Sequence, residues 1–110
     1  MRTAVLALLV GVLALRIGPD SAHAQEFTVT IKNHRFEPTE IRVPAGKRVS
    51  IYVVNEDPTP EEFESISMKV EKIIPGKSKG LVRVGPLAPG RYDFFGDFNP
   101  DTAKGVLIAE

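Results

Sequence analysis

Short runs of alternating apolar and polar residues, separated by turn-forming residues, constrain this chain more than any other feature. The segments "EFTVTI", "RVSIYVV", "SISMKV" and "LVRV" each place every second residue on one apolar face. Alternation with a period of two over short runs is typical of half-buried antiparallel strands. Proline and glycine residues separate the runs at Pro44–Gly46, Pro75–Gly76 and Pro89–Gly90, and such pairs mark turns. The sequence therefore predicts an all-β sandwich or small barrel of seven to eight short strands.

Helical signals are almost absent after residue 24. Only "TPEEFE" at 59–64 offers a capping threonine followed by a proline suited to the first position of a single helical turn. No internal repeat and no low-complexity linker divides the chain. We therefore expect one domain.

The first 24 residues have the layout of a secretory signal peptide. Arg2 precedes the apolar run "TAVLALLVGVLAL", and Ala22-His23-Ala24 forms a small-x-small ending. The apolar run is short for a bilayer span, although an uncleaved N-terminal anchor is the competing interpretation. We expect cleavage after Ala24 and export to the periplasm, which leaves residues 25–110 as the mature domain.

Charge and cysteine content exclude several functional classes. The formal net charge of the chain is zero, and no basic stripe predicts a nucleic-acid partner. The chain has no cysteine, which excludes disulfides, blue copper, iron–sulfur clusters and cysteine nucleophiles. His34 is the one histidine that remains after the predicted leader, and no Ser/His/Asp grouping supports a hydrolytic enzyme.

Several ordered motifs resemble the cupredoxin family. The segment "FEPTEIRVPAGKRVSIYVVNED" is similar to the second and third cupredoxin strands, and "GPLAPGRYDFFGDFNPDTAKGVLIAE" resembles the last two strands and the ligand loop. This resemblance covers nearly the whole of residues 25–110 and implies a cupredoxin-like Greek-key sandwich. More narrowly, "TPEEFES", "IPGKSKG" and "YDFFGDFNPDTAKG" resemble small periplasmic cupredoxin-like proteins associated with high-affinity iron permeases and other bacterial metal-uptake systems.

The resemblance also assigns the four positions that hold copper in cupredoxins, and none carries its copper ligand. The four positions correspond to Glu64, Gly96, Asn99 and either Ala103 or Lys104. A type 1 copper centre is excluded, because its thiolate and both histidines are missing. The resemblance further implies histidines at the positions of Ile66 and Asn99, and this sequence departs at both.

Glu64 is the first candidate for a different metal site. It has the same parity as Ile66 and Met68, so in a strand without a bulge its carboxylate points inward at the end of the sandwich. An inward carboxylate needs a partner. A backbone N–H or Arg35 would serve, and so would a cation.

Four further residues complete the set of candidate metal ligands. His34 lies in a loop that the cupredoxin arrangement brings beside Glu64, and Asp97 opens the final loop. Glu62 and Met68 are second choices, with core packing the favoured role of Met68. We expect most of the other acidic residues near this end, which include Glu61, Asp93 and Asp101, to be solvated.

These ligands predict a metal-handling function. Carboxylate and imidazole groups suit Fe(II), Mn(II), Zn(II) or Cu(II). We expect a periplasmic accessory protein that holds an iron ion, with copper as the alternative. It would pass the ion to a membrane iron permease or another periplasmic metal-transport protein. A ferroxidase role would need bound copper and an electron acceptor, so an enzyme is not expected. The competing hypothesis is a metal-free interaction module in which a packed polar network replaces the ancestral site.

Overall fold

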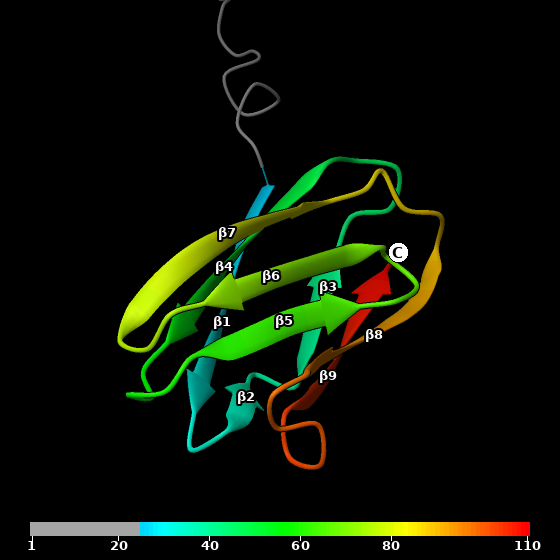
Figure 1. Ribbon diagram of the computed structural model, residues 1–110. Coiled ribbons are helices and arrows are strands. Elements are labelled where there is room, and N and C mark those ends of the chain that lie inside the picture. The colour runs from blue at the N-terminus through cyan, green and yellow to red at the C-terminus, as the bar shows by residue number, and fades with distance from the viewer. Residues whose placement is uncertain (1–24) are drawn as a thin grey trace, which may run out of the picture.

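The computed structural model describes residues 25–110, which form two β-sheets packed face to face (Figure 1). The predicted leader, residues 1–24, lies outside the described residues. The predicted all-β sandwich is confirmed, with nine strands in place of the expected seven to eight. Residues 25–110 contain no helix with the length and apolar character that crossing a membrane requires.

The chain passes back and forth between the two sheets. The first sheet has the order β2 (Arg35–Glu37), β1 (Gln25–Lys32), β4 (Val49–Asn55) and β7 (Ser78–Val84). The second sheet has the order β3 (Glu40–Val43), β9 (Lys104–Ala109), β8 (Gly90–Gly96), β5 (Glu61–Ser65) and β6 (Val70–Ile74). Strand β1 runs parallel to β4 and β3 runs parallel to β9, while the other pairs are antiparallel.

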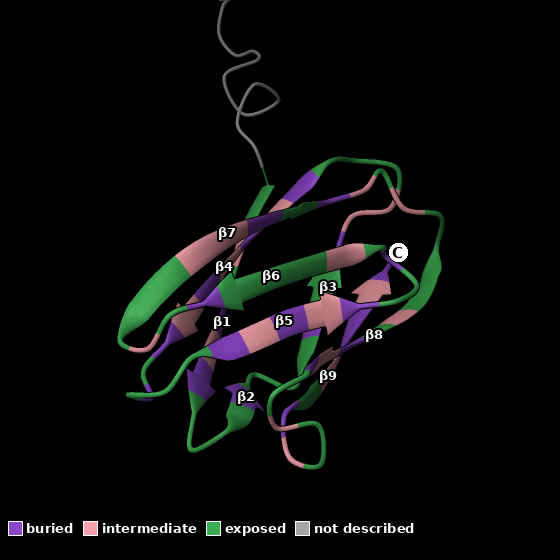
Figure 2. Cartoon of the chain, viewed as in Figure 1, coloured by how far each residue is buried: buried purple, intermediate pink, exposed green. Residues whose placement is uncertain are grey.

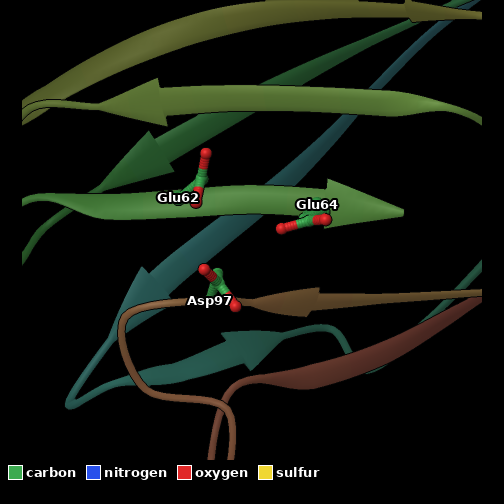
Figure 3. A group of neighbouring side chains, drawn as sticks. All are labelled: Glu62, Glu64 and Asp97. Carbon is green, nitrogen blue, oxygen red and sulfur yellow. The ribbon is translucent and has the colours of Figure 1, made fainter. Parts of the chain in front are cut away.

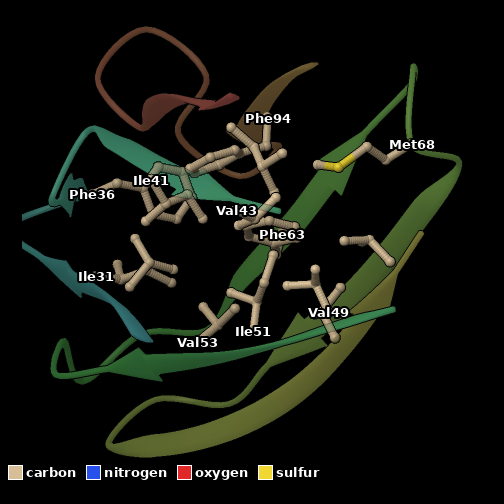
Figure 4. Close-up of a cluster of buried hydrophobic side chains, with 14 of the residues drawn as sticks. Ile31, Phe36, Ile41, Val43, Val49, Ile51, Val53, Phe63, Met68 and Phe94 are labelled. Atoms are coloured by element: carbon tan, nitrogen blue, oxygen red, sulfur yellow. The ribbon is translucent and has the colours of Figure 1, made fainter. Parts of the chain in front are cut away.

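The inner faces of the two sheets build one hydrophobic core (Figures 2 and 4). Phe36, Phe63 and Phe94 meet at its centre, with ring centroids 5.0–5.9 Å apart. Two of these pairs are edge-to-face and the Phe63–Phe94 pair is stacked, both arrangements that aromatic rings favour. Gly105 leaves room for this cluster, because a Cβ there would overlap the Phe94 ring.

The segment from residue 59 to residue 70 differs from the sequence-based expectation. No helical turn forms at "TPEEFE", because Glu61 opens strand β5. The predicted strand through "SISMKV" is also wrong, since β5 ends at Ser65 and residues 66–69 form a turn. The turn is closed by the Lys69 N–H, which donates to the Ile66 carbonyl at 3.2 Å. Ile66 is 76% exposed.

Three loops meet at one end of the sandwich, which we call the loop end. They are residues 33–34, 56–60 and 97–103. The backbone N–H groups of Asn33 and His34 donate to the carboxylate of Asp57 at 2.8 and 2.9 Å. The Thr102 hydroxyl donates to the His34 carbonyl at 2.6 Å. These bonds hold the first loop to both of the others.

The aromatic cluster gives a test of the core. Phe63→Ala should lower the free energy of unfolding by about 3–5 kcal/mol, since it removes a fully buried ring from the contact between the sheets. Phe98→Ala is the matched control, because the Phe98 side chain is 47% exposed, and it should change stability by about 0.5 kcal/mol or less. Urea unfolding of a chain that begins at Gln25 would measure both. Equal losses would contradict the assignment of Phe63 to the core.

Candidate functional site

The register of β5 decides which glutamates enter the sandwich. Residues of β5 alternate between buried and half-buried, with Glu61, Phe63 and Ser65 on the inner face. Glu62 and Glu64 therefore lie on the outer face. The expected inward direction of Glu64 is wrong, because it was inferred from parity with residues beyond the turn at 66–69, and a turn does not preserve alternation.

Glu61 is the carboxylate that enters the loop end. Its residue is 1% exposed, so the expectation that it is solvated is wrong. Oε1 accepts hydrogen bonds from the backbone N–H groups of Glu62 at 3.0 Å and Phe98 at 2.8 Å. Oε2 accepts a hydrogen bond from Nδ2 of Asn99 at 2.7 Å. These three donors compensate the burial of a group that would be costly to bury alone.

The Glu61 side chain fills the interior position that the resemblance assigns to copper. A Cβ on Gly96 would lie 2.6 Å from Cδ of Glu61 and 2.7 Å from Cβ of Ala103. Gly96, Asn99 and Ala103, which stand at ligand positions that the resemblance assigns, therefore surround a carboxylate. Glu64, which was assigned to the remaining position, lies on the outer face, so that assignment is wrong. Glycine and alanine offer no side-chain ligand, and the Asn99 amide donates to Glu61. This set of residues does not fit a type 1 copper ion.

A second group of carboxylates lies on the outer face of the same sheet (Figure 3). Glu62, Glu64 and Asp97 each offer an oxygen, and these oxygens all lie within 4.8 Å of one another. We call these three residues the carboxylate cluster. Asp97 is held beside β5 by its own N–H, which donates to the Glu62 carbonyl at 2.9 Å. In the described part of the chain, the ion pairs formed by lysine and arginine involve Arg42 and Arg91, and none includes a member of the cluster.

Desolvation, with neighbouring like charges, raises the pKa values of Glu62 and Glu64 in the carboxylate cluster. Desolvation, a hydrogen bond with Glu71 and the charges of Glu71, Asp97 and Glu64 raise the pKa of Glu62 to about 7. Desolvation and the charges of Glu71 and Asp97 also raise the pKa of Glu64. Glu71 stands directly opposite Glu64 on strand β6, an arrangement that is unfavourable for like charges. The carboxylate cluster thus concentrates negative charge and forms no ion pair with a lysine or arginine of the described chain.

His34 lies at the loop end, as expected, but outside the carboxylate cluster. Its backbone has a positive φ of 57°, and its N–H points at Asp57. Its ring Nε2 is 3.5 Å from the Thr59 hydroxyl. Desolvation would raise the pKa of Asp57, but the hydrogen bonds from the N–H groups of His34 and Asn33 outweigh it and the pKa is lowered.

Met68 lies apart from the other candidates. It follows the far end of β5, whereas Glu61 begins that strand at the loop end. Its side chain belongs to the core, and the residue is 9% exposed (Figure 4). Its favoured role as a core residue is confirmed. The structure therefore brings together Glu62, Glu64 and Asp97, and separates His34 and Met68 from them.

Comparison with known proteins agrees with the fold. The family described as the cupredoxin-like domain matches residues 4–109. The chain belongs to this family. An uncharacterised protein of Rickettsia prowazekii (strain Madrid E) is 42% identical over 94 residues, which cover 83% of this chain and 74% of that protein.

Solved cupredoxin structures are similar in fold at low sequence identity. The metal-binding domain of the Cu(I)-exporting P-type ATPase of Streptococcus pneumoniae has a TM-score of 0.69 and 16% identity, over 77% of this chain and 84% of that one. Auracyanin A, a blue copper protein of Chloroflexus aurantiacus, has a TM-score of 0.69 and 15% identity, over 80% and 100% of the two chains. Amicyanin of Paracoccus versutus has a TM-score of 0.61 and 20% identity, over 81% and 83%. At these identities the likeness shows the fold alone.

Sequence reasoning missed Glu61, although the sequence contains a signal for it. Phe63 is a large apolar residue in a short run, and residues two positions apart in a strand share a face. If Phe63, and not Met68, is taken as the inward-facing reference residue, the alternation predicts that Glu61 points inward. Phe63 and Glu61 lie in the same strand, whereas Met68 lies in the following turn.

The pKa of Glu62 predicts an unusual pH dependence of stability in the metal-free protein. Because the folded-state pKa is raised from 4.5 to about 7, the folded state binds a proton more tightly than the unfolded state between these two values. Stability should therefore fall as the pH rises through this window. Glu62→Gln should flatten the dependence and raise the melting temperature at pH 8. Thermal melting with a chelator at several pH values between about 5 and 8 would measure it.

Glu26→Gln is the matched control for this experiment. Glu26 is an exposed glutamate on strand β1, outside the cluster. The control removes the same formal charge from a position outside the cluster. It should therefore leave the pH profile close to that of the wild type. An unchanged profile in Glu62→Gln would contradict the like-charge interpretation.

Proposed function

We propose that the protein is an exported accessory protein of metal handling, and that it holds a divalent cation at the carboxylate cluster. The observation that carries this proposal is the convergence of Glu62, Glu64 and Asp97, from β5 and the loop after β8, to within 4.8 Å. No basic residue of the described chain is ion-paired with these three. A cation would supply the missing counter-charge and relieve the repulsion among them. Proteins of similar fold that bind copper support the proposal that this fold can hold a metal ion.

The ligand set suits a hard ion such as Fe(II) and lacks the soft ligands that Cu(I) prefers. Carboxylate oxygens are hard ligands, suited to Fe(II), Mn(II) and similar ions. The imidazole of His34 and the thioether of Met68, which would favour copper, are not members of the cluster. An oxygen-ligated ion also gives little support to a ferroxidase role, since that role requires copper and an electron acceptor.

The proposed place and partner of the protein rest on features of the sequence. The predicted leader at residues 1–24 would direct it to the periplasm. The resemblance to proteins associated with iron permeases suggests that a membrane iron permease, or another periplasmic metal-transport protein, receives the ion. The cluster is half-buried and exposed, so a partner would have access to it.

A metal-free interaction module is the second candidate function, and the network around Glu61 favours it. The interior position at the loop end is occupied by the chain's own carboxylate and its three donors. In this alternative, the loop end serves as a docking surface and the outer carboxylates contribute charge only. Metal titration separates the two candidates.

Metal binding can be tested at the cluster with a conservative substitution. Calorimetric titration with Mn(II), and with Fe(II) without oxygen, should show one site in a chain that begins at Gln25. Glu64→Gln should weaken binding by more than about tenfold, since even outer-sphere partners of metals contribute 10–100-fold. Its melting temperature should not fall, because the substitution removes a like charge. Glu26→Gln should bind as the wild type does.

Three outcomes would contradict the proposal. Binding that is unchanged in Glu64→Gln would show that the ion lies elsewhere. No binding of either ion to the wild type would favour the metal-free module. A loss of stability in Glu64→Gln, with unchanged affinity, would assign Glu64 a structural partner.

Export has its own test. If residues 1–24 are a cleaved leader, intact-mass analysis of protein recovered from the periplasm should give a chain that begins at Gln25. The matched variant is Ala24→Arg, which disrupts the small-x-small ending and should delay processing. Recovery of the chain with Met1 attached in the membrane fraction would favour the anchor interpretation.

A further inference from the structure

We propose that the buried carboxylate of Glu61 holds the loop end together in the way that a bound metal ion would. This carboxylate fastens the loop of residues 97–103 to strand β5 and thereby holds Asp97 at the carboxylate cluster. The fastening stands on the hydrogen bonds alone. The consequence for cation binding rests on the proposed function.

The Glu61 carboxylate is hydrogen-bonded to residues of the loop 97–103, which lie far from it in the sequence. Two of its three donors, the Phe98 N–H and Asn99 Nδ2, belong to residues 97–103 and are 37 and 38 positions away in the sequence. The third donor, the Glu62 N–H, belongs to β5. One buried carboxylate therefore links the start of β5 to the loop that follows β8. A metal in the same interior position would link the same elements through its ligands.

Asn99 makes the link effective, because it organises the loop from within. Its N–H donates to the Gly96 carbonyl at 3.0 Å, and its own carbonyl accepts from the N–H groups of Thr102 and Ala103 at 3.2 and 2.9 Å. The Gly96 N–H in turn donates to the Ala103 carbonyl at 2.9 Å. Fixing the Asn99 side chain on Glu61 thus fixes the backbone of the whole loop.

Gly96 and Glu61 depend on each other sterically. A Cβ at position 96 would lie 2.6 Å from Cδ and 2.8 Å from Oε2 of Glu61, closer than real side chains approach. Glycine, which has no side chain, therefore stands at the position that the resemblance assigns to the copper cysteine, and the Glu61 carboxylate occupies the space beside it. A larger residue at Gly96 would displace Glu61 from its donors.

Asp97 receives its position from this arrangement. Its N–H is bonded to the Glu62 carbonyl, and the next residue, Phe98, is bonded to Glu61. The hydrogen bonds made by its own N–H and by the N–H of the next residue thus hold Asp97 against β5. Besides the Glu61 bond, the N–H of Asp97 itself ties this part of the loop to β5. Glu61 is in this sense a positioning residue for the cluster.

The orientation of the hydrogen bonds allows a test by exchanging amide and carboxylate. Asn99→Asp would set two carboxylates against each other across a contact that is now 2.7 Å, and should release the loop. Glu61→Gln should be mild, because its oxygen can keep both backbone N–H groups while the Asn99 amide rotates to accept from the introduced amide. In the double variant the introduced amide of Glu61→Gln can donate to the introduced carboxylate of Asn99→Asp, so the bond is restored.

Hydrogen exchange of residues 97–103, measured with a chelator present, tests directly whether Glu61 holds the loop in place. Asn99→Asp should speed exchange of the Phe98 amide by about tenfold or more, and the double variant should recover most of the protection. Gln25→Glu, which adds the same charge at the exposed start of β1, should leave the loop unchanged. Wild-type protection in Asn99→Asp, or no recovery in the double variant, would overturn the proposal.

A second arm measures Mn(II) affinity in Asn99→Leu, which removes the donor without adding charge and covers the case that Asn99→Asp does not fold. The loosened loop should weaken binding by about tenfold, although no cluster residue has changed. Unchanged affinity with a loosened loop would overturn the positioning of Asp97 and leave the proposed function intact. Absence of Mn(II) binding in the wild type would defeat the proposed function, while the exchange result would still decide the fastening.

Discussion

The register of strand β5 is the constraint on which both the core and the candidate site depend. Pairing of Phe63 with Gly96 on β8 fixes it. In this register Phe63 joins the aromatic centre of the sandwich, and Glu61 enters the loop end beside it. A slip by one residue would exchange the two faces of β5. It would then bury Glu62 and Glu64 and expose Phe63.

The same register gives glutamates of one strand opposite environments. Glu61 meets three hydrogen-bond donors inside the sandwich, so its burial is compensated. Glu62 and Glu64 are partly desolvated and meet the like charges of Asp97 and Glu71 outside, so their pKa values rise. The inner carboxylate therefore has what it needs from the chain itself. The outer carboxylates form no ion pair with a lysine or arginine in the described chain, which is why the proposed cation belongs with them.

Membership of the cupredoxin-like family fixes the architecture of the chain but not the chemistry at its loop end. A fold can retain its strands and loops while the residues at its site change. Here the ligand positions hold glycine, asparagine and alanine, and a carboxylate occupies the space between them. The loop end keeps its place in the fold through hydrogen bonds in place of metal–ligand bonds.

The sequence by itself determined the fold class and excluded a thiolate site, because alternation with a period of two and the absence of cysteine are properties of the chain alone. The resemblance to cupredoxins also placed Glu62, Glu64 and Asp97, together with His34, near one end. Only the tertiary structure decided which glutamate is buried and that His34 and Met68 stand apart. The physical reason is that alternation gives the period of a strand but not its phase after a turn. The phase is set by pairing with β8, a partner about 30 residues away in the chain.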